Sequence, residues 1–276
     1  MADFPRTTVG GVSMPRLIIG TNWFRGFSHT TEAKDRFIKS YQTPKNVADI
    51  MTVFAEAGVD AVMGGDMNNL MTEATEEAEQ RSGRRIIRIL TPGFNSRDPS
   101  GAEGAIEAAK KAGATFCFPH QGVTDALIDR RDQVIRDIDV ITRMIRKYEM
   151  IPGLSTHMPE AIIYADSRNA DIESYVQPYN AAGFLMQVEV DWIMWVIRNA
   201  KKPVMTIKPL AAGRLTPVVG LAFVWSTIRE QDMVTIGCTT PDEAREVLEI
   251  SWDILSNRIP DYELQKTRSK KSLSVE

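Results

Sequence analysis

The chain contains three histidines, His29, His120 and His157, and their positions point more directly to chemistry than any other feature. Each follows an apolar, strand-like stretch at the point where a helix is expected to begin. Imidazole titrates near neutral pH and serves as a general acid, a general base or a metal ligand. With Asp66 the three rings would make a His and carboxylate set for a divalent metal, although no His-x-His or His-Glu-x-x-His spacing is present. Metal-assisted chemistry and metal-free acid/base chemistry are both open.

The elements that must position these rings are short apolar runs that recur along the chain. Eight of them cover residues 17–20, 59–63, 86–90, 115–118, 151–154, 172–176, 203–207 and 233–236. Each is followed by apolar residues at helical spacing, and Thr43-Pro44 and Thr240-Pro241 are typical helix starts. Alternating strands and helices pair in parallel through right-handed crossovers, which predicts a (β/α)8 TIM barrel. An open doubly wound sheet is the alternative.

Length and composition favour one domain over residues 1–276 that binds a small molecule. Residues 1–15 predict a hairpin that closes the floor of the barrel, and residues 264–276 predict a polar tail. The formal net charge of -3, from 33 Lys and Arg against 36 Asp and Glu, argues against a nucleic-acid partner. Two cysteines without a CxxC motif and the lack of an apolar signal core or membrane-spanning run predict a cytoplasmic protein with no membrane contact.

In a barrel of this kind, the loops after the strands form the active face. The candidate catalytic residues at the strand ends are His120, His157, Asp66 and Lys208, and the candidate substrate-binding residues are Trp23, His29, Asn68, Thr91, Tyr179 and Asn180. Residues 22–43 are expected to form a long loop, of the kind that often covers a ligand. The ring of strand ends is small and polar, which suits a polar substrate.

Lys208 and Asp66 each have two interpretations. A lysine at the end of a strand can form a Schiff base with a carbonyl substrate, or it can make a salt bridge or a phosphate contact. Asp66 follows two glycines that would let the backbone approach a ligand, or it is simply a turn aspartate.

The segment around the last helix start has the features of an anion site. A strand, a glycine and a capped helix start together offer free N–H groups and the positive end of a helix dipole. The candidate phosphate- or cofactor-binding residues are Arg214, Gly237, Cys238, Thr239, Thr240 and Arg245. Plain helix capping is the alternative interpretation.

Several motifs taken in order resemble those of the aldo-keto reductase superfamily over nearly the whole chain. They are Leu17-Ile18-Ile19-Gly20-Thr21, the strand that ends in His120, Gly153-Leu154-Ser155-Thr156, Val176-Gln177-Pro178-Tyr179-Asn180, Lys208-Pro209-Leu210-Ala211-Ala212-Gly213-Arg214-Leu215 and Ile236-Gly237-Cys238-Thr239-Thr240-Pro241-Asp242-Glu243. The resemblance implies a barrel that transfers hydride from NADP with an Asp-Tyr-Lys-His tetrad, and it places the cofactor's adenosine phosphate near Cys238.

The tetrad itself is largely missing. By position the Asp falls near Met63, the Tyr near Asn68 and the Lys near Thr91 or Pro92, so only His120 remains. An asparagine amide does not donate a proton as a phenol does. We therefore expect acid/base chemistry of the lyase, isomerase or hydrolase type on a small polar carbonyl, sugar or phosphorylated compound. The alternatives are a divergent NADP(H)-dependent oxidoreductase, with Tyr179 or His120 as proton donor, and a non-catalytic metabolite-binding barrel.

Overall fold

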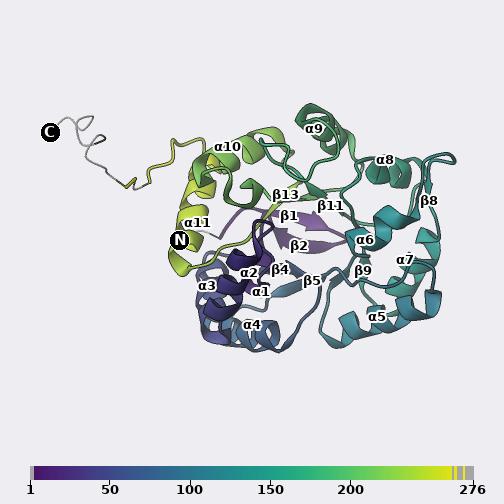
Figure 1. The fold of residues 1–276 in the computed structure, drawn as a ribbon, viewed down its shortest axis with the longest axis horizontal. Coiled ribbons are helices and arrows are strands. Elements are labelled where there is room, and N and C mark those ends of the chain that lie inside the picture. The colour runs from purple at the N-terminus through teal and green to yellow at the C-terminus, as the bar shows by residue number, and fades with distance from the viewer. Residues whose placement is uncertain (1–2, 263, 266–269, 271–276) are drawn as a thin grey trace.

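A nearly closed sheet of parallel strands, surrounded by helices, forms the body of the protein (Figure 1). The computed structural model describes residues 3–262, 264–265 and 270. In order around the barrel the strands are β3 (Leu17–Gly20), β4 (Ala61–Gly64), β5 (Ile87–Leu90), β6 (Phe116–Cys117), β9 (Ile151–Pro152), β10 (Leu154–Ser155), β11 (Tyr175–Pro178), β12 (Val204–Ile207) and β13 (Met233–Ile236). Strand β13 pairs with β3, so the predicted (β/α)8 barrel is confirmed.

The fifth barrel strand is split into two pieces at Gly153. Its first piece, β9, pairs with β6, and its second piece, β10, pairs with β11. A Cβ at Gly153 would lie 2.6 Å from Cζ of Phe118 and 2.6 Å from the carbonyl oxygen of Ser174. Only glycine fits here without a shift of its neighbours, so this residue lets the ring of strands close.

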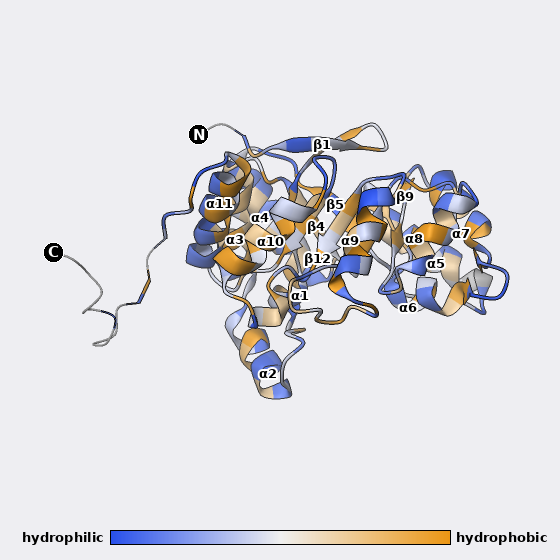
Figure 2. Cartoon of the chain, turned by 90° about the horizontal axis from the view of Figure 1, so that it is seen from above, coloured by the Kyte–Doolittle hydropathy of each residue, from blue (hydrophilic) through white to orange (hydrophobic). Residues whose placement is uncertain are grey.

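Helices follow every barrel strand, as the alternation predicts. They are α1 (Asn22–Arg25), α2 (Glu32–Tyr41) and α3 (Pro44–Glu56) after β3, α4 (Asn69–Ser82), α5 (Pro99–Lys111), α6 (Gln121–Thr124) with η1 (Asp125–Leu127) and α7 (Ile138–Lys147), α8 (Glu160–Ser167), α9 (Val190–Asn199), η2 (Ala211–Gly213) with α10 (Pro217–Thr227), and α11 (Pro241–Leu255). The expected loop over residues 22–43 is therefore wrong, because it contains α1 and α2. Figure 2 shows α2 projecting from one end of the barrel.

The opposite end of the barrel carries the predicted N-terminal hairpin (Figure 2). It consists of β1 (Arg6–Val9) and β2 (Val12–Pro15), which pair antiparallel. Val9 and Met14 pack with Ile18 and Met205 in the cluster that fills the barrel interior. The hairpin thus closes the floor. A second small hairpin, β7 (Ile128–Asp129) and β8 (Val134–Ile135), lies between η1 and α7.

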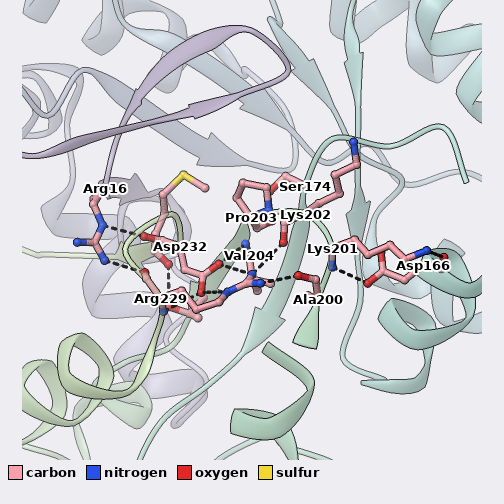
Figure 3. A network of polar contacts seen from close by, with 12 residues as sticks. Arg16, Asp166, Ser174, Ala200, Lys201, Lys202, Pro203, Val204, Arg229 and Asp232 are labelled. Atoms are coloured by element: carbon pink, nitrogen blue, oxygen red, sulfur yellow. Dashed lines mark hydrogen bonds and ion pairs between the residues drawn. The ribbon is translucent and has the colours of Figure 1, made fainter. Parts of the chain in front are cut away.

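A network of charges and carbonyls ties together the beginnings of β12 and β13 (Figure 3). The fully buried carboxylate of Asp232 accepts from the guanidinium of Arg229 and, at 2.8 Å, from the main-chain N–H of Val204. Arg229 also donates to the carbonyls of Ala200 and Lys202. Arg16 donates to the carbonyls of Asp232 and Arg229 at 3.1 and 2.9 Å. Each buried charge here has an opposite charge or a carbonyl against it.

In the part of the chain that the structure describes, no helix has the length and apolar character that crossing a membrane requires. The expected polar tail at residues 264–276 falls outside the described residues, apart from residues 264, 265 and 270.

Candidate active site

A cavity of about 1260 Å³ lies at the carboxyl ends of the barrel strands, where the sequence places the chemistry. Of the candidate residues it is lined by Trp23, His29, Asp66, Thr91, His120, His157, Lys208, Arg214, Gly237, Cys238 and Thr239. The strand ends therefore do bring most of the expected side chains to one place. Asn68, Tyr179, Asn180, Thr240 and Arg245 are not part of its wall.

Lys208 enters this cavity because its backbone breaks the pattern of β12. Met205 and Ile207 face the barrel interior and Val204 faces the helices. Strict alternation would therefore turn residue 208 toward the helices. Instead Lys208 has a φ of 64°, in the left-handed region, and its side chain reaches the cavity. A lysine held in this conformation costs on the order of 1–3 kcal/mol, and such strain concentrates at functional sites.

Among the described residues, the amine of Lys208 has no opposite charge beside it to stabilise it. No carboxylate of the described residues lies within ion-pair distance of Nζ, which instead lies 3.3 Å from Nε2 of His157. Burial lowers the pKa of Lys208 to about 8. About a tenth of the amine is then uncharged at pH 7, far more than for an ordinary lysine, and the uncharged amine is the nucleophile. The salt bridge that the sequence left open for Lys208 is absent from the described part of the protein.

His157 is the partner of this amine. Burial, followed by the positive charges of Lys208, His120 and His29, lowers the pKa of His157 to about 4. The ring is therefore neutral at pH 7, and its Nε2 accepts a hydrogen bond from Nζ of Lys208. The three histidines and Lys208 influence one another's charge, so they form one electrostatic site.

His120 begins α6 and faces the same cavity. Its Nδ1 accepts a hydrogen bond of 3.2 Å from the main-chain N–H of Gly122. We therefore assign the ring proton of neutral His120 to Nε2, which leaves this atom as a donor. Burial lowers the pKa of His120, with a smaller lowering from Lys208 and an opposite effect from Asp125. The ring is suited to donate a hydrogen bond to a carbonyl oxygen.

Asp125 is a residue of this site that sequence reasoning missed. Its carboxylate accepts from Oγ1 of Thr156 at 2.5 Å and from the main-chain N–H of His157 at 3.2 Å. Burial raises the pKa of Asp125. The residue holds the segment that carries His157, so it is a positioning residue. The sequence offers only its place five residues after His120 as a signal.

The expected metal site at His29, His120 and His157 is not formed. Among the described residues, no group of three or more His, Cys, Asp or Glu side chains is arranged to hold a metal ion. His29 lies at the exposed rim, where its Nε2 is 3.2 Å from the amide nitrogen of Asn22. Asp66 is paired with Arg25, and Nε2 of His157 faces an ammonium group. These contacts leave no shared set of ligands.

Three of the expected substrate-binding residues have structural roles instead. Asn68 is the N-cap of α4 and accepts from the N–H of Met71 at 3.1 Å. Tyr179 is fully buried, and its hydroxyl is 2.9 Å from Oγ1 of Thr227. Burial raises the pKa of this phenol, and its ring is outside the cavity. The amide of Asn180 binds both the N–H and the carbonyl of Phe184.

The helix start that was expected to bind phosphate is capped by the chain's own carboxylate. Thr240 accepts from the N–H of Glu243 at 3.2 Å, and the N–H of Thr239 donates to the carboxylate of Glu243 at 2.6 Å. Glu243 and Glu246 also line this end of the cavity. Two carboxylates repel a phosphate, so the residues here do not fit the adenosine phosphate of NADP. In this structure the helix start is capped by its own side chains.

The other members of the expected phosphate set are also engaged elsewhere. Arg245 faces solvent and pairs with Asp242 at 2.6 Å. Arg214 lines the cavity, but it donates to the carbonyl of Ala211 and stacks on the ring of Phe184. Cys238 is buried, which raises the pKa of its thiol. Gly237 is required by packing, because a Cβ there would lie 2.9 Å from Cδ1 of Trp23.

Comparison with known proteins supports the fold alone. No protein-family model and no curated protein sequence matches the chain. Among solved structures, a Pseudomonas aeruginosa protein classed with the aldo-keto reductases superposes with a TM-score of 0.67 at 12% identity, over 92% of this chain and 99% of that one. An aldo-keto reductase from Brucella melitensis gives 0.58 at 12% identity, over 96% and 95%.

A protein named for a different reaction also superposes on the chain, less closely. The orotidine 5'-monophosphate decarboxylase of Methanocaldococcus jannaschii superposes with a TM-score of 0.52 at 16% identity, over 86% of this chain and 98% of that one. The chain thus has a (β/α)8 fold like that of the aldo-keto reductases, and proteins named for other reactions share this fold. Because such barrels carry many chemistries, the function must be argued from the cavity.

Proposed function

We propose that the chain is an enzyme that acts on a small polar carbonyl compound through an imine with Lys208. The observation that carries this proposal is the uncompensated amine of Lys208, which lies 3.3 Å from Nε2 of His157 in a cavity at the carboxyl ends of the strands. Its pKa of about 8 leaves free amine available near neutral pH. A surface lysine with an ordinary pKa is almost fully protonated there and attacks carbonyls poorly.

The neighbouring rings have roles that fit this chemistry. The free amine of Lys208 adds to the carbonyl carbon, and Nε2–H of His120 donates a hydrogen bond to the carbonyl oxygen. Nε2 of His157 takes the proton that the amine nitrogen loses on addition and passes it to the alkoxide oxygen, which gives a neutral carbinolamine. His157 then delivers a second proton, taken up from solvent, to the hydroxyl group, which leaves as water while the nitrogen lone pair forms a protonated imine. Burial and the nearby positive charges lower the pKa of His157 to about 4, so its protonated ring gives up a proton readily.

The imine then acts as an electron sink for the carbon next to the former carbonyl. A carbon–hydrogen or carbon–carbon bond at that position breaks heterolytically, and its electron pair is delocalised onto the imine nitrogen. Addition of water reverses the first step and restores the amine. Cleavage of a carbon–carbon bond makes the protein a lyase, and transfer of the proton to another carbon makes it an isomerase.

Reductive trapping tests the proposal. The protein would be incubated with a panel of aldehydes, ketones and oxo acids and with cyanoborohydride, which reduces an imine to a stable secondary amine. Mass spectrometry of the digested chain should locate the adduct on Lys208. Lys208→Met should abolish it. Lys147→Met is the matched control, since Lys147 is exposed, pairs with Glu103 at 2.8 Å and has a raised pKa because of that contact.

A negative result would separate the remaining candidates. If no compound is trapped on Lys208 while NADPH quenches tryptophan fluorescence in a saturable way, the protein is a divergent reductase and the proposal fails. If neither occurs and carbonyl compounds bind without turnover, the barrel is a binding protein.

A further inference from the structure

Arg25 lies on the wall of the cavity and is paired with a carboxylate that is mostly exposed. It is the last residue of α1, directly after the first barrel strand, and 19% of its side chain is exposed. Its Nη2 forms an ion pair with Asp66, whose side chain is 61% exposed. The pair therefore joins a largely buried cation to an anion on the solvent side.

This arginine is held differently from the structural arginine at the other end of the barrel. Arg16 donates to two main-chain carbonyls, which fix its guanidinium. In Arg25, Nε is buried and has no hydrogen-bond partner among the described residues. The ring of Phe27 lies 5.7 Å from its guanidinium carbon. Packing positions Arg25, and Asp66 alone among the described carboxylates neutralises it. An exposed carboxylate contributes little to stability, so another carboxylate can replace it at low cost.

The position of Arg25 connects it to the reactive groups. A Cβ at Gly65 would lie 3.4 Å from Nη1 of Arg25 and 4.0 Å from the carbonyl oxygen of Thr91. The next residue, Pro92, accepts through its carbonyl from the main-chain N–H of His120 at 3.0 Å. The guanidinium thus lies beside the chain segment that holds His120, and both residues line the cavity that contains Lys208.

We propose that Arg25 binds the carboxylate of the substrate and that Asp66 holds this position until the substrate displaces it. The substrate class is then a small oxo acid, with its carboxylate on Arg25 and its carbonyl between Lys208 and His120. This inference rests on the proposed function, because it assigns the substrate of the same cavity. Asp66 is a competitor for Arg25 and has no part in the chemistry.

Calorimetric titration with pyruvate tests the inference without any need for turnover. Hydroxyacetone serves as the neutral analogue and inorganic phosphate as the second anion. Arg25→Gln should weaken pyruvate binding by about 10–100-fold, the usual effect of losing a hydrogen bond between charged groups. Asp66→Asn should tighten it several-fold, because the competitor is gone. Arg245→Gln, which breaks the exposed pair with Asp242, is the matched control and should leave binding unchanged.

Each outcome decides the matter. Equal affinity of the wild type and Arg25→Gln, absence of pyruvate binding to the wild type, or weaker binding in Asp66→Asn would overturn the inference. Tighter binding of phosphate than of pyruvate, lost in Arg25→Gln, would overturn the assignment of a carboxylate. Circular dichroism of each variant identifies any that fails to fold, and Arg25→Lys then replaces Arg25→Gln with a smaller expected loss. If binding follows the expected pattern but cyanoborohydride traps nothing on Lys208, the inference stands and the proposed imine chemistry fails.

Discussion

Arg229 and Lys208 are cations at opposite ends of the barrel, and they differ in the groups that surround them. Arg229, before the start of β13, is bound by both oxygens of Asp232 and by two carbonyls. Lys208, after the end of β12, lies 3.3 Å from a neutral imidazole and has no ion pair with any described residue. Burying a charge without an opposite charge lowers stability, whereas a paired and hydrogen-bonded charge is tolerated. The difference separates the end that holds the barrel together from the end that lines the cavity, where we place the proposed chemistry.

The largest expected effect is at the paired end. Asp232→Ala should lower the free energy of unfolding by about 3–5 kcal/mol, because it leaves Arg229 and the N–H of Val204 without their carboxylate. Urea unfolding measures this change. Asp242→Ala removes an exposed partner of Arg245 and should change stability by less than about 0.5 kcal/mol. A similar small effect of Asp232→Ala would show that the network does not hold this end together.

At the cavity end of the barrel, removing the charge should raise the free energy of unfolding instead of lowering it. Lys208→Met should raise the free energy of unfolding at neutral pH by about 1–3 kcal/mol, because it removes a partly buried charge that has no ion pair among the described residues, while keeping the chain length. The pKa of Lys208 falls from 10.5 to about 8 on folding, so between these values the unfolded state binds more protons. The cost of the charge is full below pH 8 and disappears above pH 10.5.

Urea unfolding of the wild type and Lys208→Met across this pH range measures the effect. The advantage of the variant should shrink as the pH rises, and imine trapping should be lost throughout. A variant that is less stable than the wild type at neutral pH would contradict the contrast between the two ends.

A smaller effect concerns the ring beside Lys208. In Lys208→Met the pKa of His157 should rise from about 4, since the second largest cause of its lowering is gone. It should stay below 6.5, because burial is the largest cause and remains. Proton NMR of the ring resonances can follow this directly, as the chain has three histidines. His29 and His120, whose pKa values are also lowered by Lys208, should shift in the same direction. An unchanged pKa of His157 would mean that the two groups are not in contact.

The fold was predictable because eight apolar runs and eight helical patterns admit few closed arrangements. The alternation of side chains along a strand could have shown that Tyr179 does not line the cavity. Tyr179 is four residues after Tyr175 on β11, so both side chains face the helices. Lys208 is the reverse case. Alternation along β12 would turn the side chain of Lys208 toward the helices, and its left-handed backbone conformation turns it into the cavity instead.

Ion pairs and hydrogen bonds between distant segments could not be predicted from the sequence. Nothing in the spacing of Arg25 and Asp66 indicates that they form an ion pair. The sequence also does not indicate that Asp125 accepts from the main-chain N–H of His157, 32 residues later. At the start of α11, the sequence showed both a possible anion site and a capping glutamate. The carboxylate of Glu243 takes the N–H group that a phosphate would need, a competition that only geometry reveals.

The central claim is that Lys208 is an uncompensated amine with a lowered pKa, and its titration tests this most directly. The chain would be labelled briefly with a trace of an amine-reactive reagent over a range of pH, and mass spectrometry would quantify the modification of each lysine. Lys208 should be half-labelled near pH 8, while Lys147 titrates above its ordinary value of 10.5. A midpoint for Lys208 at or above 10.5 would contradict the account.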